Sequence, residues 1–177
     1  MVTIGSTHEG RTNSHKDFFN ADDYRHDPEH FKLPPYVPQT TEMRAIYARQ
    51  YDLITKMDKG FGQIIENLKK DGLYDNTIIF FFSDHGFGLP KGKRWLLPTG
   101  LRVPLIVRIP DKYRELSTGS PGSKNNQLVN FPDFAPTVLN LAGLDIPDYM
   151  QGIPFLGKKK FDPKKMLFGS RDRKSVV

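Results

Sequence analysis

Residues 77–86 read TIIFFFSDHG, an apolar run of strand length that ends in Ser-Asp-His-Gly. Because its apolar part does not alternate with polar side chains, it predicts a strand buried on both faces, as in the centre of a parallel sheet. A second run of this kind, VPLIVRI, covers residues 103–109. Upstream, apolar side chains recur at steps of three and four from Tyr47 to Leu68. This spacing predicts one long amphipathic helix over about 42–70.

Two further elements follow. Residues 132–143, PDFAPTVLNLAG, predict a short helix with Asp133 as its cap and Gly143 at its end. The piece MLFGSR at 166–171 predicts one more strand. The first forty residues, 1–40, are rich in His, Asp, Pro and Asn and predict a loop-rich region. Strands that alternate with helices favour an α/β fold.

Composition and charge limit the classes of function. The chain has 177 residues, no cysteine and a net charge of +6. Without cysteine, disulfides, thiolate metal sites and a cysteine nucleophile are excluded for these residues. The last twenty residues, 158–177, hold eight basic and two acidic side chains, so the rest is neutral. A charge run of this kind predicts a solvated tail, and nucleic acid is not an expected partner.

The chain also contains no apolar run of about 18 residues, so no membrane partner is expected. Its polar start, MVTIGSTHEGRT, does not resemble a signal peptide.

The residues with chemistry follow the first predicted strand. Asp84 and His85 stand where ligands bind in open parallel sheets, and Gly86 lets the chain bend there. A carboxylate and an imidazole side by side can ligate a divalent cation, but they can equally be an ordinary turn. The loop that follows carries three cations suited to an anionic ester: Lys91, Lys93 and Arg94. Trp95 is either a substrate platform or part of the loop packing.

In their order, these segments resemble the C-terminal part of the sulfatase catalytic domain, in the alkaline phosphatase-like superfamily. The helix that leads to SDHG is the first of them. The second is the lysine-bearing loop KGKRWLLPTGLRVPLIVRIP at 91–110. NFPDFAPTVLNLAGLDIP at 130–147 resembles the family's D-x-x-P-T-x-L-x-x-A-G helix, and GIPF follows it. The letters KRWL also resemble the heparan N-sulfatase-like branch.

The resemblance implies a mixed, largely parallel sheet flanked by helices, incomplete because the N-terminal part of the domain is missing. Within it, residues 1–157 form a partial catalytic domain, with 41–157 as its core. Residues 158–177 are expected to be a basic, truncated C-terminal segment.

The resemblance also assigns roles to single residues. Asp84 and His85 match the two consecutive ligands of one calcium ion, although many relatives have Asn at the second position. Lys93 matches the lysine that binds the sulfate group, and His8 matches the histidine that assists the leaving group. These two are the expected catalytic residues. Arg94, in the same loop, is expected to shape the substrate pocket and bind substrate, although the resemblance assigns no role to it.

Two features of the family are missing from these residues. Sulfatases make their formylglycine nucleophile from the Cys or Ser of C/S-x-P-x-R, and nothing here fits that pattern. The N-terminal Asp-Asp pair that supplies further calcium ligands is also absent. We therefore expect a fragment that is inactive alone, with the formylglycine in the missing segment and the complementary N-terminal part of the domain as a partner.

The expected function is that of a sulfatase-like hydrolase of sulfate esters or sulfamates, with a carbohydrate as the sulfated substrate. Two alternatives stay open: a phosphodiesterase or phosphonate hydrolase of the same superfamily, and a catalytically inactive remnant. Members of the family are periplasmic, secreted or lysosomal, and the location of this chain is left unassigned.

Overall fold

The computed structural model describes residues 2, 4, 7 and 26–170 of the chain, which form two compact units. The first unit contains the residues up to Tyr74 together with Phe82–Leu105. The second contains Asp75–Phe81 and Ile106–Ser170. Within the part that the structure describes, no helix is both long and apolar enough to cross a bilayer.

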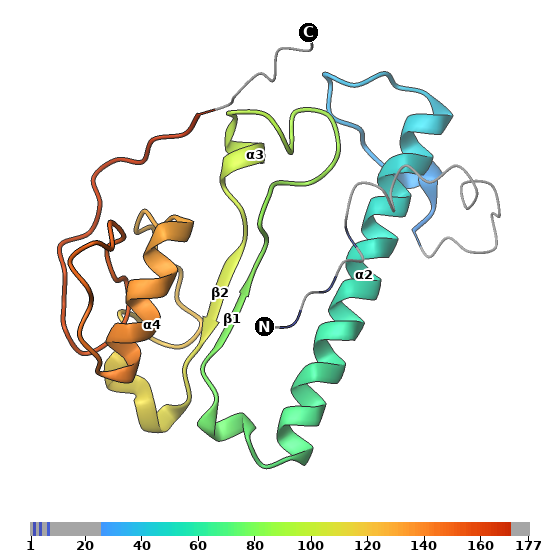
Figure 1. The fold of residues 1–177 in the computed structure, drawn as a ribbon. Coiled ribbons are helices and arrows are strands. Elements are labelled where there is room, and N and C mark those ends of the chain that lie inside the picture. The colour runs from blue at the N-terminus through green and yellow to red at the C-terminus, as the bar shows by residue number, and fades with distance from the viewer. Residues whose placement is uncertain (1, 3, 5–6, 8–25, 171–177) are drawn as a thin grey trace, which may run out of the picture. The chain divides into compact units, whose positions relative to one another are not determined.

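The long helix predicted from the sequence is present as α2, Thr41–Lys70 (Figure 1). It begins at Thr40, whose hydroxyl accepts a hydrogen bond of 3.3 Å from the backbone N–H of Met43. This bond satisfies one of the N–H groups that have no partner within the first helical turn. The helix ends where Gly72 adopts a φ of +67°, which glycine tolerates without steric cost.

The core of the first unit lies at the start of α2. Here the proline-rich segment before the helix packs against it through Leu33, Val37 and Tyr47. Leu89, from the loop that follows β1, completes this cluster. We call these four residues the anchor cluster. It fixes one point of that loop to the first unit.

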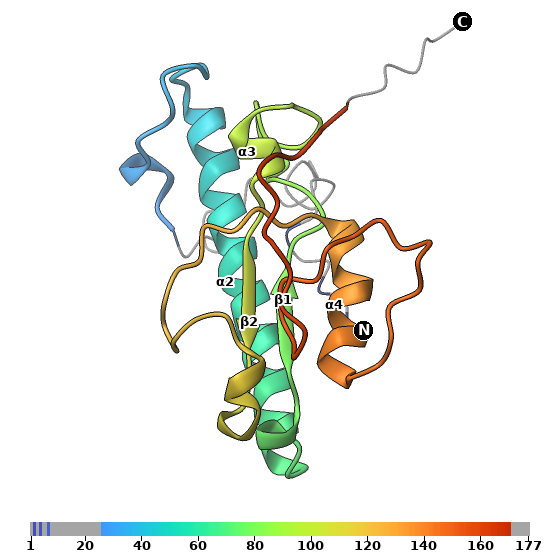
Figure 2. The same ribbon diagram turned by 90° about the vertical axis from the view of Figure 1, so that its left-hand side faces the viewer.

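The two apolar runs form β1, Ile79–Phe82, and β2, Leu105–Arg108, which pair as a two-stranded sheet. Both views show them side by side, and their arrows point in opposite directions (Figures 1 and 2). The backbone N–H of Ser83 donates to the carbonyl of Pro104, joining the end of β1 to the start of β2. The prediction of a largely parallel arrangement is therefore wrong for this pair, since the connecting loop returns at the same edge without a crossover helix.

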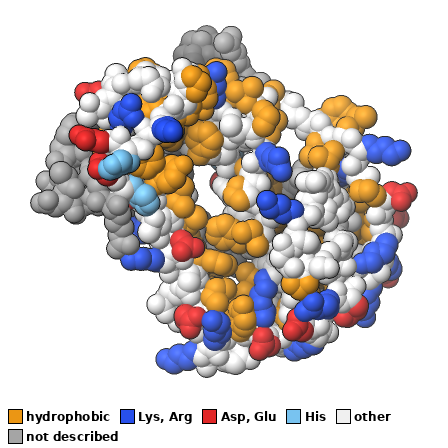
Figure 3. Space-filling view, turned by 180° about the vertical axis from the view of Figure 1, so that it is seen from behind, with side chains coloured by type: hydrophobic (Ala, Val, Ile, Leu, Met, Phe, Trp, Pro, Cys, Tyr) orange, Lys and Arg blue, Asp and Glu red, His pale blue; other side chains and the backbone are white. Residues whose placement is uncertain are grey.

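The expectation that both strands are buried on both faces is also not met. Ile106 in β2 is 62% exposed, and Phe82 at the end of β1 is 37% exposed. Within the described residues this sheet has only two strands, so neither strand is paired on both of its edges. Figure 3 shows further hydrophobic side chains at the surface.

The second unit is built around α4, Phe134–Ala142, which ends at Gly143 with a φ of +72°. An aromatic cluster joins β1, α4 and the segment after α4. The ring centroid of Phe134 lies 6.0 Å from that of Phe80 and 5.7 Å from that of Phe155. Short 3-10 turns complete the unit's elements: Asp111–Leu116 and Phe131–Asp133.

A row of buried polar side chains on and before α4 holds the segment 153–159. Asp133, Thr137 and Asn140 are at most 2% exposed and lie at helical spacing. The amide of Asn140 donates to the carbonyls of Leu156 and Lys159, both at 2.8 Å. The backbone N–H of Phe155 donates to the Thr137 hydroxyl at 3.1 Å. We call these three residues the polar seam, because they replace water as partners of buried backbone groups.

Asp133 occupies the N-cap position of α4, as the sequence predicted, but its side chain makes no capping bond to that helix. One carboxylate oxygen accepts from the backbone N–H of Asn130 at 2.9 Å, and the other from that of Ile153 at 2.8 Å. Lys164 pairs with the same group, its Nζ 2.5 Å from Oδ1. Asp133 instead connects three segments of the second unit.

The strand predicted at 166–171 is absent from residues 166–170, which the structure describes without regular elements. The nearest ladder contact is an isolated antiparallel bridge between Leu128 and Lys164. Lys164 is also the basic residue that departs most clearly from a solvated tail, since its side chain is only 16% exposed.

Candidate functional site

The loop 83–104 leaves β1 and returns to β2, and it carries most of the site residues predicted from the sequence. At its start the Ser83 hydroxyl donates to the carbonyl of His85 at 2.7 Å, which closes a tight turn. Asp84 and His85 point outward from this turn, with side chains 85% and 55% exposed. His85 Nε2 lies 3.8 Å from Asp84 Oδ2, so the two groups are neighbours in space as well as in sequence.

Three glycines let this loop fold tightly onto itself. A Cβ added to Gly86 would lie 2.2 Å from the carbonyl oxygen of Thr99, and one on Gly92 would lie 2.0 Å from that of Phe87. On Gly100 it would lie 2.2 Å from the carbonyl oxygen of Trp95. These positions admit no side chain because backbone passes directly against backbone. The backbone of the loop is therefore closely packed at three points between residues 86 and 100, which restricts the positions of the Cα atoms there.

Lys93 is held at the centre of this packing. Its backbone N–H donates to the carbonyl of Phe87 at 2.8 Å. The residues on either side of the Gly92–Lys93 pair, Lys91 and Arg94, have φ values of +64° and +74°. Non-glycine residues rarely adopt this left-handed conformation, and such strain persists where the surroundings impose it. The side chain of Lys93 is partly buried and that of Arg94 is exposed.

One of the three basic residues of the loop, Lys91, contacts a segment outside the loop. Lys91 Nζ lies 4.4 Å from the centre of the Tyr36 ring, a cation–π contact with the proline-rich segment. Lys91 therefore fastens the loop beside the anchor cluster, while Lys93 and Arg94 stay with Asp84 and His85 in the same loop. His8 lies outside the described residues, so its predicted role beside Lys93 remains a prediction.

Within the described residues, Asp84 and His85 bring together only two of the donors that a calcium ion needs. Calcium takes six or more oxygen ligands. Here one exposed carboxylate, Asp84, stands beside one imidazole nitrogen of His85. No group of three or more His, Asp or Glu side chains within the described part of the chain has the arrangement of a metal site. Asp84 and His85 are at most a corner of such a site.

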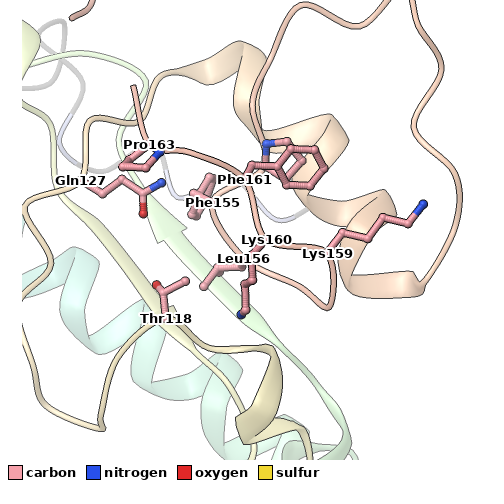
Figure 4. A pocket seen from close by; sticks show the side chains of 9 residues that line it. Thr118, Gln127, Phe155, Leu156, Lys159, Lys160, Phe161 and Pro163 are labelled. Atoms are coloured by element: carbon pink, nitrogen blue, oxygen red, sulfur yellow. The ribbon is translucent and has the colours of Figure 1, made fainter. Parts of the chain in front are cut away.

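A cavity of about 80 Å³ lies in the second unit and contains none of the predicted site residues (Figure 4). Two lysines line it beside Thr118, Gln127 and Phe155. Lys159 Nζ pairs with Asp145 at 2.9 Å, and Lys160 Nζ donates to the carbonyl of Gly157 at 3.1 Å. The residues that line this cavity therefore belong to another part of the chain than the predicted site residues.

Sequence reasoning missed two sets of residues that support the fold around the site. The anchor cluster joins Leu33 and Leu89, which are far apart in the sequence, so no local pattern indicated it. The polar seam had a visible signal, because Asp133, Thr137 and Asn140 recur at steps of four and three within an otherwise apolar helix.

Comparison with known proteins places this geometry in a family. The model of the family named Sulfatase matches residues 7–144. An ulvan-active sulfatase from Formosa agariphila is 41% identical over 143 residues, which is 81% of this chain and 23% of that protein. The N-sulphoglucosamine sulphohydrolase of Homo sapiens is 31% identical over 124 residues, 70% of this chain and 24% of that protein.

Among solved structures, the chain is similar to the phosphonate monoester hydrolase SpPMH from Silicibacter pomeroyi, with a TM-score of 0.56 and 30% identity. The likeness covers 72% of this chain and 25% of that one. The chain thus spans about a quarter of the length of the proteins it matches. Because the family model covers well over half of it, including α2, the Ser-Asp-His-Gly turn and α4, the chain belongs to the sulfatase family.

Proposed function

We propose that this chain forms the sulfate-binding part of a sulfatase catalytic domain that hydrolyses sulfate esters or sulfamates. The observation that carries the proposal is the loop 83–104, which presents Asp84, His85, Lys93 and Arg94 from one tightly packed segment. This loop lies within the residues that match the sulfatase family model.

Lys93 is the residue we propose to bind the sulfate group. A fixed ammonium group stabilises the negative charge that grows on the ester oxygens during hydrolysis, and it does so best when its position is set beforehand. The bond from its backbone N–H to Phe87 and the close contact at Gly92 fix the backbone from which this side chain extends. We place Arg94 at the edge of the same pocket, and His8 beside the leaving group.

Asp84 and His85 are proposed as two donors of a divalent cation, calcium in the family's manner. Their exposure leaves both groups accessible to further ligands. The remaining donors would have to come from residues that the structure does not describe or from another polypeptide segment. A bound cation of this kind would supply positive charge beside the sulfate.

The proposed substrate is a sulfated carbohydrate. Two relatives support this class by their names, since one is an ulvan-active sulfatase and the other is an N-sulphoglucosamine sulphohydrolase. The letters KRWL and the 31% identity to human N-sulphoglucosamine sulphohydrolase support the heparan N-sulfatase-like branch, whereas the higher identity to the ulvan-active enzyme gives no preference for it.

No residue of the chain fits C/S-x-P-x-R, so we propose that these 177 residues alone do not turn over a sulfate ester. The formylglycine would come from a complementary N-terminal segment of the domain. Exposed apolar side chains such as Ile106 and Leu101, at 62% and 55%, are consistent with a surface that another segment covers.

A phosphonate or phosphodiester hydrolase is the second candidate, because the similar solved structure is a phosphonate monoester hydrolase. The two reactions share a tetrahedral anionic centre, so the same lysine suits both. Activity towards phenyl phosphonate that exceeds activity towards the sulfate ester would favour this candidate.

A chimera tests the proposal directly. The matching 143-residue segment of the Formosa agariphila enzyme is replaced by this chain's own, so that the host supplies the nucleophile. Hydrolysis of ulvan is then measured for the chimera and for Lys93→Ala and Asp84→Asn. We expect each substitution to lower kcat/KM by about 100-fold, as the loss of one preorganised charge does.

Lys59→Ala is the matched control, since Lys59 is an exposed lysine on α2, and it should leave the rate unchanged. A chimera that hydrolyses ulvan equally well with and without Lys93 would contradict the proposed role of this residue. A folded chimera without activity would contradict the proposal for the chain as a whole.

A further inference from the structure

Trp95 lies two residues beyond Lys93 and is the only tryptophan of the chain. Its side chain is 49% exposed, and it is followed by Leu96 and Leu97, exposed to 49% and 37%. The described part of the loop therefore presents a large, flat apolar group next to two cations, Lys93 and Arg94.

The backbone of Trp95 is fixed on both sides. Its N–H donates to the carbonyl of Gly92 at 3.1 Å, and its own carbonyl oxygen lies against Gly100. The left-handed φ of +74° at Arg94 turns the chain immediately before it. A side chain that starts from a fixed backbone and rotates about only two bonds loses little entropy when a ligand binds to it.

This combination has a specific chemical complement. A pyranose ring carries an apolar C–H face that packs on an indole, while a sulfate substituent on the same ring needs a cation. We propose that Trp95 is the stacking platform for the sugar ring whose sulfate group Lys93 binds. The inference rests on the proposed function, and it adds the residue that selects a sugar sulfate over a free anion.

The competing assignment is that Trp95 packs within the loop or under another segment. The partial exposure of the indole, together with the adjacency of Lys93 and Arg94 in the sequence, favours the sugar, because an apolar cover over this stretch would remove water from both cations. If this alternative holds, the affinity for the sulfated sugar will not depend on the indole ring of Trp95.

The test uses the full 177-residue chain and N-acetylglucosamine 6-sulfate, with N-acetylglucosamine and inorganic sulfate as comparison ligands. Emission from the single tryptophan reports on Trp95 alone. We expect a saturable change with the sulfated sugar and none with inorganic sulfate. Dissociation constants are then measured by ligand-observed NMR for the variants, whose helical content is checked by circular dichroism.

Trp95→Ala should weaken binding of the sulfated sugar about tenfold, the scale of one lost aromatic contact with its buried area. It should leave inorganic sulfate binding unchanged, and Trp95→Phe should cost less than about threefold. Trp95→Leu keeps an apolar side chain without a flat ring and should behave like Trp95→Ala. Tyr149→Ala, which removes an aromatic side chain that is 80% exposed, is the matched control and should have no effect.

Equal affinities of the wild-type chain, Trp95→Ala and Trp95→Leu for the sulfated sugar would overturn the platform role. If binding still depended on Lys93 in that case, the proposed function would stand. If neither the sulfated sugar nor inorganic sulfate bound, or if Lys93→Ala changed nothing, the proposed function and this inference would both fail.

Discussion

The loop 83–104 and the polar seam on α4 both contain polar residues of the family pattern, and they use them in opposite ways. In the seam, Asp133, Thr137 and Asn140 are at most 2% exposed, and their side chains bind the backbone of neighbouring segments. In the loop, backbone groups bind one another across glycines, and the side chains of Asp84 and His85 are largely exposed.

The difference shows that polar residues of one family pattern can serve either stability or ligand binding. A polar side chain that satisfies buried backbone groups cannot leave them without a large cost, so it serves stability. A side chain on a loop held by its own backbone can exchange water for a ligand at little cost. The seam residues are thus structural, and the loop residues are the candidates for chemistry.

The largest expected effect comes from breaking the seam. Asp133→Ala removes the acceptor for the N–H groups of Asn130 and Ile153 and leaves the Lys164 ammonium without its carboxylate. Removing one partner of a buried pair costs about 3 kcal/mol or more. The free energy of unfolding, measured by urea titration, should fall by that amount.

Asp145→Ala is the matched control, because Asp145 also pairs with a lysine, Lys159, but its carboxylate is fully exposed. It should leave the midpoint of the urea transition unchanged. If both substitutions gave the same midpoint, the seam would not support the second unit.

The next effect comes from the backbone contacts of the loop. Gly92→Ala places a Cβ 2.0 Å from the carbonyl oxygen of Phe87, so the loop has to shift. We expect a destabilisation of about 2 kcal/mol and earlier proteolytic cleavage between residues 83 and 104. Gly62→Ala is the control, since a Cβ there meets nothing within 4 Å and lies in a helix, where alanine is favoured. Unchanged protease resistance of Gly92→Ala would show that the loop is not tightly packed.

A pH effect tests the anchor cluster that holds Leu89. Burial raises the pKa of Tyr47 from 10.0 to about 12, and the neighbouring Tyr36 adds to the shift. Because the neutral phenol is favoured in the folded chain, its stabilisation is present below about pH 10 and is lost as the pH rises towards 12. The full loss is about 3 kcal/mol, since one pKa unit corresponds to about 1.4 kcal/mol.

Thermal unfolding between pH 8 and pH 12 measures this loss, and Tyr47→Phe should remove most of the alkaline decline. Tyr149→Phe is the matched control, since Tyr149 is 80% exposed and should keep the decline. An identical alkaline profile for the wild-type chain and Tyr47→Phe would exclude Tyr47 as its origin.

The smallest effect is expected at the site itself. Lys93→Ala should change the free energy of unfolding by less than about 0.5 kcal/mol, as surface substitutions do, although we expect it to abolish sulfate binding. Differential scanning fluorimetry with and without sulfate separates the two. A large loss of stability would move Lys93 to the structural side of the comparison.

Much of the local structure could be predicted from the sequence. The periodicity from Tyr47 to Leu68 predicted a helix that is present as Thr41–Lys70, and Gly143 ends α4 as expected. Both apolar runs form strands. These elements depend on the pattern of residues within a short window, which can be seen in the sequence itself.

The direction of the strands could not be predicted in this way. An uninterrupted apolar run is typical of a parallel sheet, yet β1 and β2 run in opposite directions. The loop 83–104 between the two strands contains only one four-residue helix, α3, Pro98–Leu101. The length of such a loop does not determine whether the second strand runs parallel or antiparallel to the first. The position of Asp133 was likewise read as a cap because its partners Ile153 and Lys164 are distant in sequence.

For the site, the sequence indicated Asp84, His85, Lys93 and Arg94 as one group, and the structure places His85 Nε2 3.8 Å from Asp84 Oδ2. The grouping of the two cations with them stays a prediction. The sequence did not separate Lys91 from them, because the contact of Lys91 with Tyr36 joins residues more than fifty positions apart. The metal and sulfate roles of the group stay predictions.

The sequence by itself determined the family, the helices α2 and α4, the positions of β1 and β2 and the chemical types at the site, since these depend on residue identity and local spacing. Only the tertiary structure decided which polar residues are buried and which face solvent. That distinction depends on whether a distant segment packs over a side chain and offers it a partner. Asn130 and Ile153 offer their backbone N–H groups to the buried carboxylate of Asp133. Asp84 remains 85% exposed, on the turn that the Ser83 hydroxyl closes.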